Sequence, residues 1–502
     1  MARFNKKTVG SKTVNLAGGE AYKETAELEL VSLLLTSFVN DKFYESAKDQ
    51  LKRLAELTKS IKDKKFIGQS AVYARNEFGM RSITHALIAE LVNQVKGQEW
   101  TKNAVAKTVH RVDDMSEMVS YYAGKYGKPI PNSLKKGLRF AFGKFDQYQL
   151  AKYRGENKDV KLVDLVNLVH PKPNDKNSKA LKQLIEGDLK STDTWEAKLT
   201  EAGKVEAETD EEREAKVAEN KKEAWASMIK GGKLGYFALL RNLRNIEEQA
   251  PEVLDSALKM LVDEKQIKKS LVLPFRFMTA IDQLQQDGTS AKVLKALNAA
   301  LELSLSNVPK FDGKTLIVVD HSGSMDSHQN GKSLTNFEMG AMFGAMLAKT
   351  NDADFMYFGD IAKYYTINPG DSLTTIVKTL NKLNGTGYSF YDDHSGTQVG
   401  HGTNFHSIFE TAKTSYDRIF IFSDMQGWVG YSAPQKSYLA YNKKRKANSK
   451  IYSIDLSGHG TLQFPENNVY CLAGFSDKIF DLMKLLEEDR NALINKIKKI
   501  EL

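Results

Sequence analysis

Apolar residues recur at helical spacing through roughly the first three hundred positions of the chain. Leu28, Val31 and Leu35 lie three and four residues apart, and the same period returns over 105–119 and 294–305. This spacing places apolar side chains on one face of a helix. We therefore expect helices almost everywhere up to about residue 306. Their number and size favour stacked helix pairs, as in a solenoid, over one compact bundle.

One segment of this helical half lacks large apolar residues. Residues 199–223 are charged and rich in alanine. Such a composition is typical of a solvated helix or a connector, and we assign it no function.

After residue 310 short apolar runs alternate with helical patterns. The runs contain β-branched and aromatic residues and cover 315–320, 354–358, 418–423, 450–454 and 468–472. A run of this kind is typical of a strand buried on both faces. Alternation with helices predicts a parallel, doubly wound α/β sheet, followed by a final helix from about Asp477. We expect a helical domain over residues 1–308 and an α/β domain over residues 309–502.

Composition excludes several classes of protein. The chain has 502 residues and a single cysteine, so no intramolecular disulfide can form, and disulfide scaffolds, zinc fingers and iron–sulfur proteins are poor interpretations. The N-terminus has no apolar segment of the secretory type. The densest apolar stretch, residues 31–35, is far shorter than the roughly 20 residues of a membrane span. We expect a soluble, cytoplasmic protein.

The positive charge is concentrated in the helical half. The net charge is +9, but residues 311–502 carry 20 basic and 21 acidic residues, whereas residues 1–180 carry 32 and 20. A basic excess on one part of a protein favours a large anionic partner, of which nucleic acid is the commonest. The alternative is that this mild excess of basic residues only keeps the protein soluble.

Oxygen-bearing side chains follow two of the predicted strands. Asp320, Ser322 and Ser324 form an Asp-x-Ser-x-Ser motif at the end of the first strand, and Asp424 follows the strand 418–423. Ligands of open α/β sheets bind at the carboxyl ends of strands. A carboxylate and hydroxyls suit magnesium or manganese better than zinc. In the alternative, the motif only caps a helix.

These residues, together with Thr403 in a glycine-rich stretch, resemble the metal-ion-dependent adhesion site of a von Willebrand factor type A domain. The resemblance implies that Asp320, Ser322, Ser324, Thr403 and Asp424 hold a divalent cation, Mg²⁺ before Mn²⁺ or Ca²⁺. It also implies an open coordination position that takes a carboxylate or other oxygen from a partner. This is a mechanism of binding and requires no nucleophile or general base.

Histidines gather near the same loops. Their spacing fits no standard pattern of metal ligands, so we expect side chains that face water rather than a second, softer metal site. The five are His321, His328, His394, His401 and His406.

Two segments of the helical half combine cations with aromatic residues. Residues 134–154 and 168–173 contain Lys and Arg, which can neutralise phosphates, and Tyr and His, which offer flat faces to unstacked bases. We expect the apolar members of these segments to be core. These are Leu138, Phe142, Phe145 and Leu150.

The helical half resembles the TROVE module of the Ro autoantigen and its bacterial relatives over roughly residues 15–300. The segments that carry the resemblance are 71–81, 110–115, 135–154, 168–173 and 225–245. A type A domain follows in both. The resemblance implies a ring of HEAT-like helical repeats that the type A domain closes. It implies that single-stranded 3′ ends of misfolded RNA enter a basic central hole and that small, structured Y-like RNA binds the outer surface.

The resemblance assigns Lys152 and His170 to contacts with Y RNA. A second cation of the family has no secure counterpart, because this segment is one residue longer, and Lys158 is a candidate for it. Further candidate RNA-binding residues lie in the resembling motifs, although arginines in such repeats can also cap helices or pair with acids. They are Arg154, Lys172, Lys135, Arg139, Arg75, Arg81, Arg241 and Arg244.

The sequence thus predicts a ribonucleoprotein scaffold that acts in RNA quality control or degradation, beside an exoribonuclease as a further partner. The alternative is a metal-dependent protein-interaction scaffold without RNA binding. An enzyme is the third hypothesis, and we find no P-loop, HExxH or nucleophile–base arrangement in its favour. The basic run 443–446 is expected to be a solvated loop before the next strand.

Overall fold

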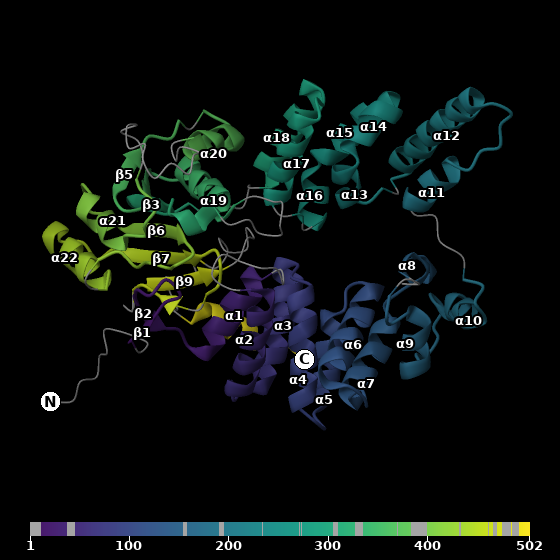
Figure 1. Ribbon diagram of the computed structural model, residues 1–502, viewed down its shortest axis with the longest axis horizontal. Coiled ribbons are helices and arrows are strands. Elements are labelled where there is room, and N and C mark those ends of the chain that lie inside the picture. The colour runs from purple at the N-terminus through teal and green to yellow at the C-terminus, as the bar shows by residue number, and fades with distance from the viewer. Residues whose placement is uncertain are drawn as a thin grey trace. The chain divides into compact units, whose positions relative to one another are not determined.

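The computed structural model, shown in Figure 1, describes most of the chain. The described residues are 12–37, 46–153, 158–189, 195–232, 234–270, 272, 274–304, 310–326, 335–368, 370–382, 399–430, 433–459, 461–464, 469–473, 483 and 491–502.

The segment up to residue 304 is mainly helical, as its apolar period predicts. Its helices are α1 (Ala26–Thr36), α2 (Ala47–Ser60), α3 (Lys64–Phe78), α4 (Ser82–Gln94), α5 (Glu99–Thr108), α6 (Val112–Tyr126), α7 (Asn132–Phe142), α8 (Gln147–Lys152), α9 (Leu162–Val169), α10 (Ser178–Glu186), α11 (Trp195–Ala202), α12 (Asp210–Lys230), α13 (Tyr236–Arg241), α14 (Leu243–Gln249), α15 (Leu254–Leu261), α16 (Glu264–Ser270), α17 (Pro274–Gln286) and α18 (Ala291–Ser304). The charged segment predicted to be a solvated helix or connector contains most of α12, whose side chains are largely exposed.

The chain divides into two compact units. One contains residues 1–87 and 307–501, and the other contains residues 88–306. The predicted domains, 1–308 and 309–502, stay a prediction.

Helices of the second unit pack in pairs, among them α5 with α7, α11 with α12, and α17 with α18. Gly137 explains the close approach of α7 to α5, because a Cβ atom there would lie 2.4 Å from the Cβ of Val105. Paired helices of this kind bury their apolar faces against each other. The predicted helical repeats are confirmed.

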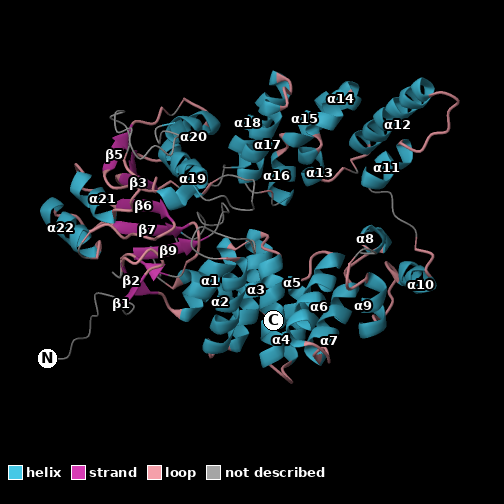
Figure 2. Ribbon diagram, viewed as in Figure 1, coloured by secondary structure: helices cyan, strands magenta, loops and turns pink. Residues whose placement is uncertain are grey.

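A six-stranded sheet forms the centre of the other unit (Figure 2, magenta). Its order is β5-β4-β3-β6-β7-β9, with β3 (Thr315–Asp320), β4 (Ala353–Phe358), β5 (Ala362–Tyr365), β6 (Arg418–Ser423), β7 (Lys450–Asp455) and β9 (Val469–Ala473). All neighbours pair in parallel except β5, which is an antiparallel edge strand.

Helices α19 (Asn336–Thr350), α20 (Leu373–Lys382), α21 (Phe405–Thr411) and α22 (Gln435–Arg445) accompany this sheet, and α24 (Ala492–Lys498) lies near the C-terminus. Helix α19 packs on β3, β4 and β6. Every residue of β3 is buried, which explains its continuous apolar run. The predicted α/β fold is confirmed, and the antiparallel strand β5 was not foreseen.

Residues 12–23 form a β-hairpin where helices were expected. Strands β1 (Lys12–Val14) and β2 (Glu20–Lys23) pair antiparallel, and β2 pairs with β8 (Thr461–Leu462) through Tyr22 and Leu462. The hydroxyl of Tyr22 donates to Gln435 Oε1 at 2.8 Å. The hairpin is thus an added part of the α/β unit.

Helices α1 and α3 also pack within the α/β unit. Helix α1 contacts β9, and α3 contacts α24. The side-chain amide of Gln69 donates to the carbonyls of Lys498 at 2.7 Å and Ile500 at 2.8 Å. Gly458 is required beside α1, since a Cβ atom there would lie 2.0 Å from Thr36 Oγ1.

Two predictions concern the C-terminal part of the chain, namely the loop at 443–446 and the helix from about Asp477. Lys443, Lys444 and Arg445 form the last turn of α22 and only Lys446 leaves it, with a φ of 51°, so the predicted loop at 443–446 is wrong. Lysine and arginine favour this position because they lie at the negative end of the helix dipole. Most of the helix predicted from Asp477 lies outside the described residues.

Candidate metal centre and RNA-binding surface

Asp320 ends the central strand β3 and is completely buried. The backbone N–H of Ser322 donates to Asp320 Oδ1 at 2.9 Å, and the hydroxyl of Ser423, the last residue of β6, donates to Oδ2. The turn that follows β3 and the end of β6 therefore fix the carboxylate of Asp320 from two sides.

Asp424 comes directly after β6, and the chain turns sharply at the next residue. Met425 has a φ of 59°, in the left-handed region, and its N–H donates to Ser423 Oγ at 3.0 Å. Asp424 Oδ1 accepts the N–H of Gln426 at 3.2 Å, whereas Oδ2 is buried and accepts no hydrogen bond. A buried carboxylate oxygen without a hydrogen bond fits a site for a cation or a proton.

Both carboxylates are held in an environment that disfavours their charge. Burial raises the pKa of Asp320, and burial together with the charge of Asp320 raises the pKa of Asp424. Two buried carboxylates repel each other when both are ionised. A divalent cation between them would remove this penalty.

The hydroxyls of the motif lie beside these carboxylates. Ser322 Oγ lies 3.4 Å from Ser324 Oγ, and both side chains are buried. Thr403 is also buried, and its carbonyl accepts the N–H of Trp428 at 3.2 Å, in the loop that follows Asp424.

The donor set fits a hard divalent cation. It combines two carboxylates with three hydroxyl groups, one carboxylate oxygen is unpartnered, and all five residues are buried. Among the described residues, no group of three or more His, Cys, Asp or Glu side chains is placed to hold a metal ion. A cation here would therefore depend on hydroxyl oxygens as well as carboxylates.

The histidine prediction is wrong for His321, which is 1% exposed. Its ring packs against Phe337, with centroids 4.1 Å apart, and against Tyr357 at 5.8 Å. His321 follows a strand buried on both faces, so its side chain enters the core. His401 is exposed as predicted, and His406 is half-buried, with Nδ1 2.8 Å from Ser437 Oγ. His328 and His394 lie outside the described residues.

The N-terminal hairpin contacts the loop that carries Asp424. The side-chain amide of Asn15 donates to the carbonyl of Gly427 at 2.6 Å, and the N–H of Leu16 donates to Gln426 Oε1 at 2.7 Å. Gly19 is required because a Cβ atom there would lie 1.9 Å from the Gly427 carbonyl oxygen. The hairpin thus fixes the residues that follow Asp424.

A cavity of about 180 Å³ lies between this hairpin and the loop. Gly18, Gly19, Thr403 and the half-exposed Trp428 are among its lining residues. The cavity therefore adjoins one candidate metal ligand.

Of the predicted RNA-binding residues, Lys152 lies in a cluster of cations and aromatic rings. Its Nζ lies 5.9 Å from the ring centre of Tyr148 and 5.6 Å from that of Tyr153, and the guanidinium of Arg111 lies 4.7 Å from the latter ring. Tyr148 is 41% exposed. We call Arg111, Tyr148, Lys152 and Tyr153 the cation–aromatic cluster.

Asp113 links Lys158 to this cluster. Arg111 forms two hydrogen bonds to the carboxylate of Asp113, at 3.0 and 2.9 Å, and Lys158 Nζ lies 3.7 Å from Asp113 Oδ2. Lys158 therefore shares Asp113 with Arg111 of the cluster, and Asp113 offsets part of its charge.

His170 and Arg139 form a second group. His170 ends α9 in the left-handed conformation, with a φ of 48°, and its side chain is exposed. Arg139 Nε donates to the carbonyl of Val169 at 2.6 Å, which places Arg139 next to His170. Lys172 is exposed two residues further on.

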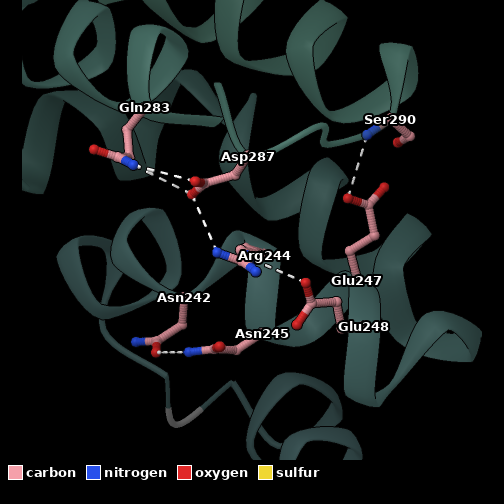
Figure 3. A network of polar contacts seen from close by, with 8 residues as sticks. All are labelled: Asn242, Arg244, Asn245, Glu247, Glu248, Gln283, Asp287 and Ser290. Carbon is pink, nitrogen blue, oxygen red and sulfur yellow. Dashed lines mark hydrogen bonds and ion pairs between the residues drawn. The ribbon is translucent and has the colours of Figure 1, made fainter. Parts of the chain in front are cut away.

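Other candidates have structural partners. Arg75 is only 7% exposed and donates to the carbonyl of Gly79 at 3.4 Å. Arg244 pairs with Glu248 at 2.8 Å and with Asp287 at 3.3 Å, as Figure 3 shows. Such pairs are the alternative role that arginine takes in helical repeats.

Arg81 and Lys135 are half-buried, and Arg241 is exposed beside the ring of Phe237. Arg154 lies outside the described residues. The residues predicted to be core, namely Leu138, Phe142, Phe145 and Leu150, are all buried.

The sequence did not single out Arg111, although it lies in the quoted segment 110–115. Its side chain reaches Tyr153 from a helix start far away in the chain. No periodic signal marks such a contact, since only the tertiary fold brings the start of α6 to the residue after α8. The pattern Arg-x-Asp, with both residues at a helix N-terminus, is the one local hint.

Stacked helix pairs joined to a mostly parallel α/β sheet, with oxygen ligands at the ends of β3 and β6, define a helical-repeat protein that carries a type A domain. Sequence models of two domains agree with this class. A TROVE domain matches residues 30–212 and 189–342, and a Ro60 vWA domain matches residues 314–485. The chain belongs to the TROVE family, with the type A domain of Ro proteins.

A solved structure and two curated proteins are similar to this chain. The crystal structure of the Deinococcus radiodurans RO (RSR) protein covers 91% of this chain and 99% of its own, with a TM-score of 0.59 at 17% identity, and so shares the fold. Telomerase protein component 1 is 21% identical over 361 residues in Rattus norvegicus and 22% identical over 334 residues in Mus musculus. The matches cover 55% and 52% of this chain but 14% and 13% of those proteins.

None of the helices among the described residues is both long enough and apolar enough to cross a bilayer.

Proposed function

We propose that this protein is a non-enzymatic RNA-binding scaffold. Membership of the TROVE family supports RNA binding, and the cation–aromatic cluster carries the proposal. Its exposed Tyr148 offers a stacking face, with Lys152 beside it, and Arg111 adds positive charge at the neighbouring ring of Tyr153. Cations and aromatic rings placed together are the usual means of binding unstacked bases and their phosphates.

Small structured RNA of the Y type is the ligand we assign to the surface of Lys152 and His170. Both side chains lie outside the core, and Lys158, Arg139 and Lys172 add cations beside one or the other. Arg139 also donates a hydrogen bond to the backbone of Val169, so its side chain lies next to His170. Phosphates bound by such side chains give affinity that falls steeply with salt.

Single-stranded ends of misfolded RNA are the second ligand we assign to the helical unit. Its role would then be to present RNA for degradation in quality control, with an exoribonuclease as partner. The protein would contribute binding and no chemistry of its own.

In the type A domain we propose that Asp320, Ser322, Ser324, Thr403 and Asp424 hold Mg²⁺. The buried, unpartnered Asp424 Oδ2 supports this proposal. When bound, the cation would offer one coordination position to an oxygen ligand of a partner. The same observation favours a second candidate function, namely metal-dependent binding of a protein through this domain.

Fluorescence anisotropy with a labelled small stem-loop RNA tests the proposed function. We expect Lys152→Glu to weaken binding about tenfold and Asp320→Ala to leave it unchanged, because the RNA surface and the metal centre use different residues. Equal affinity of the Lys152→Glu variant and the wild type at low salt would contradict the assigned surface. Lys216→Glu is the matched control, since Lys216 lies on the acidic helix α12 and pairs with Glu212.

A further inference from the structure

Trp428 is a large aromatic residue that the α/β unit leaves at its surface. It is 52% exposed, although tryptophan is on average a well-buried residue. It also lines the cavity of about 180 Å³ between the N-terminal hairpin and the loop that follows Asp424. An exposed tryptophan at a cavity is typical of a binding surface, because its ring offers a large contact area and loses little conformational freedom on binding.

The backbone that carries this ring is fixed from two sides. The N–H of Trp428 donates to the carbonyl of Thr403 at 3.2 Å, and the N–H of Val429 donates to the same carbonyl at 3.4 Å. On the other side the hairpin lies so close that a Cβ atom at Gly19 would be 2.8 Å from Trp428 Cα. The ring is therefore presented from an ordered backbone, which lowers the entropic cost of binding a partner.

Hydrogen bonds connect this exposed surface with the metal centre. Thr403, which accepts the N–H of Trp428, is one of the five candidate ligands and lines the same cavity. Leu16, on the hairpin turn, is 53% exposed, and its N–H donates to Gln426 Oε1 at 2.7 Å. The N–H of Gln426 in turn donates to Asp424 Oδ1 at 3.2 Å. Two exposed apolar residues are therefore each connected to a candidate ligand.

The size and the chemistry of the cavity suit one aromatic ring. An apolar cavity of roughly 150 Å³ holds a benzene ring. The acidic lining residue, Glu20, pairs with Lys12, and the described residues that line the cavity include no Lys or Arg. Much of the wall is backbone, because four of the lining residues are glycines, namely Gly18, Gly19, Gly427 and Gly430. The cavity therefore favours an uncharged ring over a phosphate.

We propose that the cavity beside Trp428 binds an aromatic side chain of a partner protein, next to an acidic residue of the same segment. The acidic residue supplies the oxygen ligand of the metal centre, and the aromatic ring stacks on Trp428. The proposal rests on the second candidate function, metal-dependent binding of a protein, and adds the kind of segment that is bound. Because an aromatic pair adds to the binding free energy, the ring selects among acidic segments.

The test titrates the full-length protein with three capped, unlabelled peptides, in MgCl₂ and in EDTA, by saturation-transfer NMR. Gly-Phe-Asp-Phe-Gly carries a ring on either side of the carboxylate, Gly-Ala-Asp-Ala-Gly lacks the rings, and Gly-Phe-Asn-Phe-Gly lacks the charge. In MgCl₂ we expect the first peptide to bind about tenfold more tightly than the second. Replacing the aspartate by asparagine, or MgCl₂ by EDTA, should weaken binding of the first peptide by about tenfold or more.

Substitution of Trp428 tests the cavity itself. We expect Trp428→Ala to weaken binding of Gly-Phe-Asp-Phe-Gly about tenfold and to leave Gly-Ala-Asp-Ala-Gly unchanged, because only the first peptide has a ring to stack. Trp428→Phe should retain most of the affinity. Leu439→Ala is the matched control, since Leu439 is 49% exposed on α22 and is not among the residues that line the cavity.

Thermal unfolding separates a binding role from a structural one. Trp428 is exposed, and its hydrogen bond to Thr403 comes from the backbone. The Trp428→Ala variant should therefore keep the melting temperature of the wild type and its response to Mg²⁺. A lowered melting temperature, or an equal weakening of both aspartate peptides, would overturn the proposal.

Failure of the aromatic site and failure of the second candidate function give different results. If the wild type binds none of the peptides, or binds them equally in MgCl₂ and in EDTA, metal-dependent binding of a protein is wrong and the aromatic site with it. If both aspartate peptides bind with the same affinity and EDTA removes that binding, only the aromatic site is wrong.

Discussion

The candidate metal centre and the cation–aromatic cluster are built in opposite ways. At the metal centre all five predicted ligands are buried, and backbone N–H groups and hydroxyls fix their carboxylates. In the cluster, long side chains lie against the exposed ring of Tyr148 and the half-buried ring of Tyr153, and Asp113 offsets part of their charge. Buried ligands favour one geometry and one small ion, whereas exposed cations and rings adapt to an extended, variable polymer.

The largest effect should follow from breaking the buried centre. Asp424→Ala or Asp320→Ala removes one carboxylate, so we expect the Mg²⁺-dependent rise in melting temperature to disappear. For the wild type that rise corresponds to about 2.7 kcal/mol at a Mg²⁺ concentration of 100 Kd. Differential scanning fluorimetry with MgCl₂ and with EDTA measures it.

Asp312→Asn, an exposed change in the same unit, should retain the full response. An unaltered response to Mg²⁺ in the Asp424→Ala variant would count against the metal centre.

The exposed surface should be less sensitive to each single change. We expect Lys152→Glu combined with His170→Ser to weaken binding of a small stem-loop RNA about 10- to 100-fold, with no change in melting temperature, because neither side chain lies in the core. Anisotropy and thermal unfolding of the same samples provide both readouts. A loss of stability equal to the loss of binding would show that these residues are structural.

A substitution in the hairpin should weaken cation binding at the metal centre without changing any of the candidate ligands. Asn15→Ala removes the hydrogen bond to Gly427 and the two that Asn15 Oδ1 accepts from Ala17 and Gly19, so we expect a loss of about 1 to 3 kcal/mol in the free energy of unfolding and a weaker response to Mg²⁺. Thermal unfolding at several Mg²⁺ concentrations tests this. An unchanged apparent affinity for Mg²⁺ would mean that the hairpin does not position the Asp424 loop.

The smallest effect concerns Glu24, which follows the hairpin. Burial and the charge of Asp455 raise the pKa of Glu24 from 4.5 to about 8. Between these two pH values the folded protein keeps a proton that the unfolded chain has lost. The contribution of this proton to the free energy of unfolding is fully present below pH 4.5 and is lost as the pH rises through about 8. We expect Glu24→Gln to raise the free energy of unfolding at pH 8 and to have little effect at pH 4.5, because glutamine copies the protonated form of the side chain. The melting temperature should depend less on pH between 4.5 and 8 in the Glu24→Gln variant than in the wild type. The same dependence in both proteins would contradict this assignment.

The sequence predicted the sheet, and the strand ends at which the candidate ligands lie, because both leave local marks. A buried strand is a continuous apolar run, and Asp320 and Asp424 follow such runs directly. The helices of the first three hundred residues were predicted equally well from the helical spacing of their apolar residues. These features depend on neighbours in the chain and not on distant contacts.

Features that depend on distant contacts were missed. The hairpin at residues 12–23 is stabilised by pairing with β8, more than four hundred residues away, and its short strands have no period of their own. His321 lies in a motif of polar residues, yet its ring is buried against Phe337.

The measurement that tests the central claim most directly is binding of a small stem-loop RNA at 50 and 200 mM salt by the wild type and by Asp320→Ala. The account predicts that affinity falls about 10³-fold over this range, as roughly six phosphate contacts require, and that both proteins behave alike. An affinity that does not change with salt concentration, or binding that is lost in the Asp320→Ala variant, would contradict an RNA-binding helical unit. Either result would favour a metal-dependent interaction module instead.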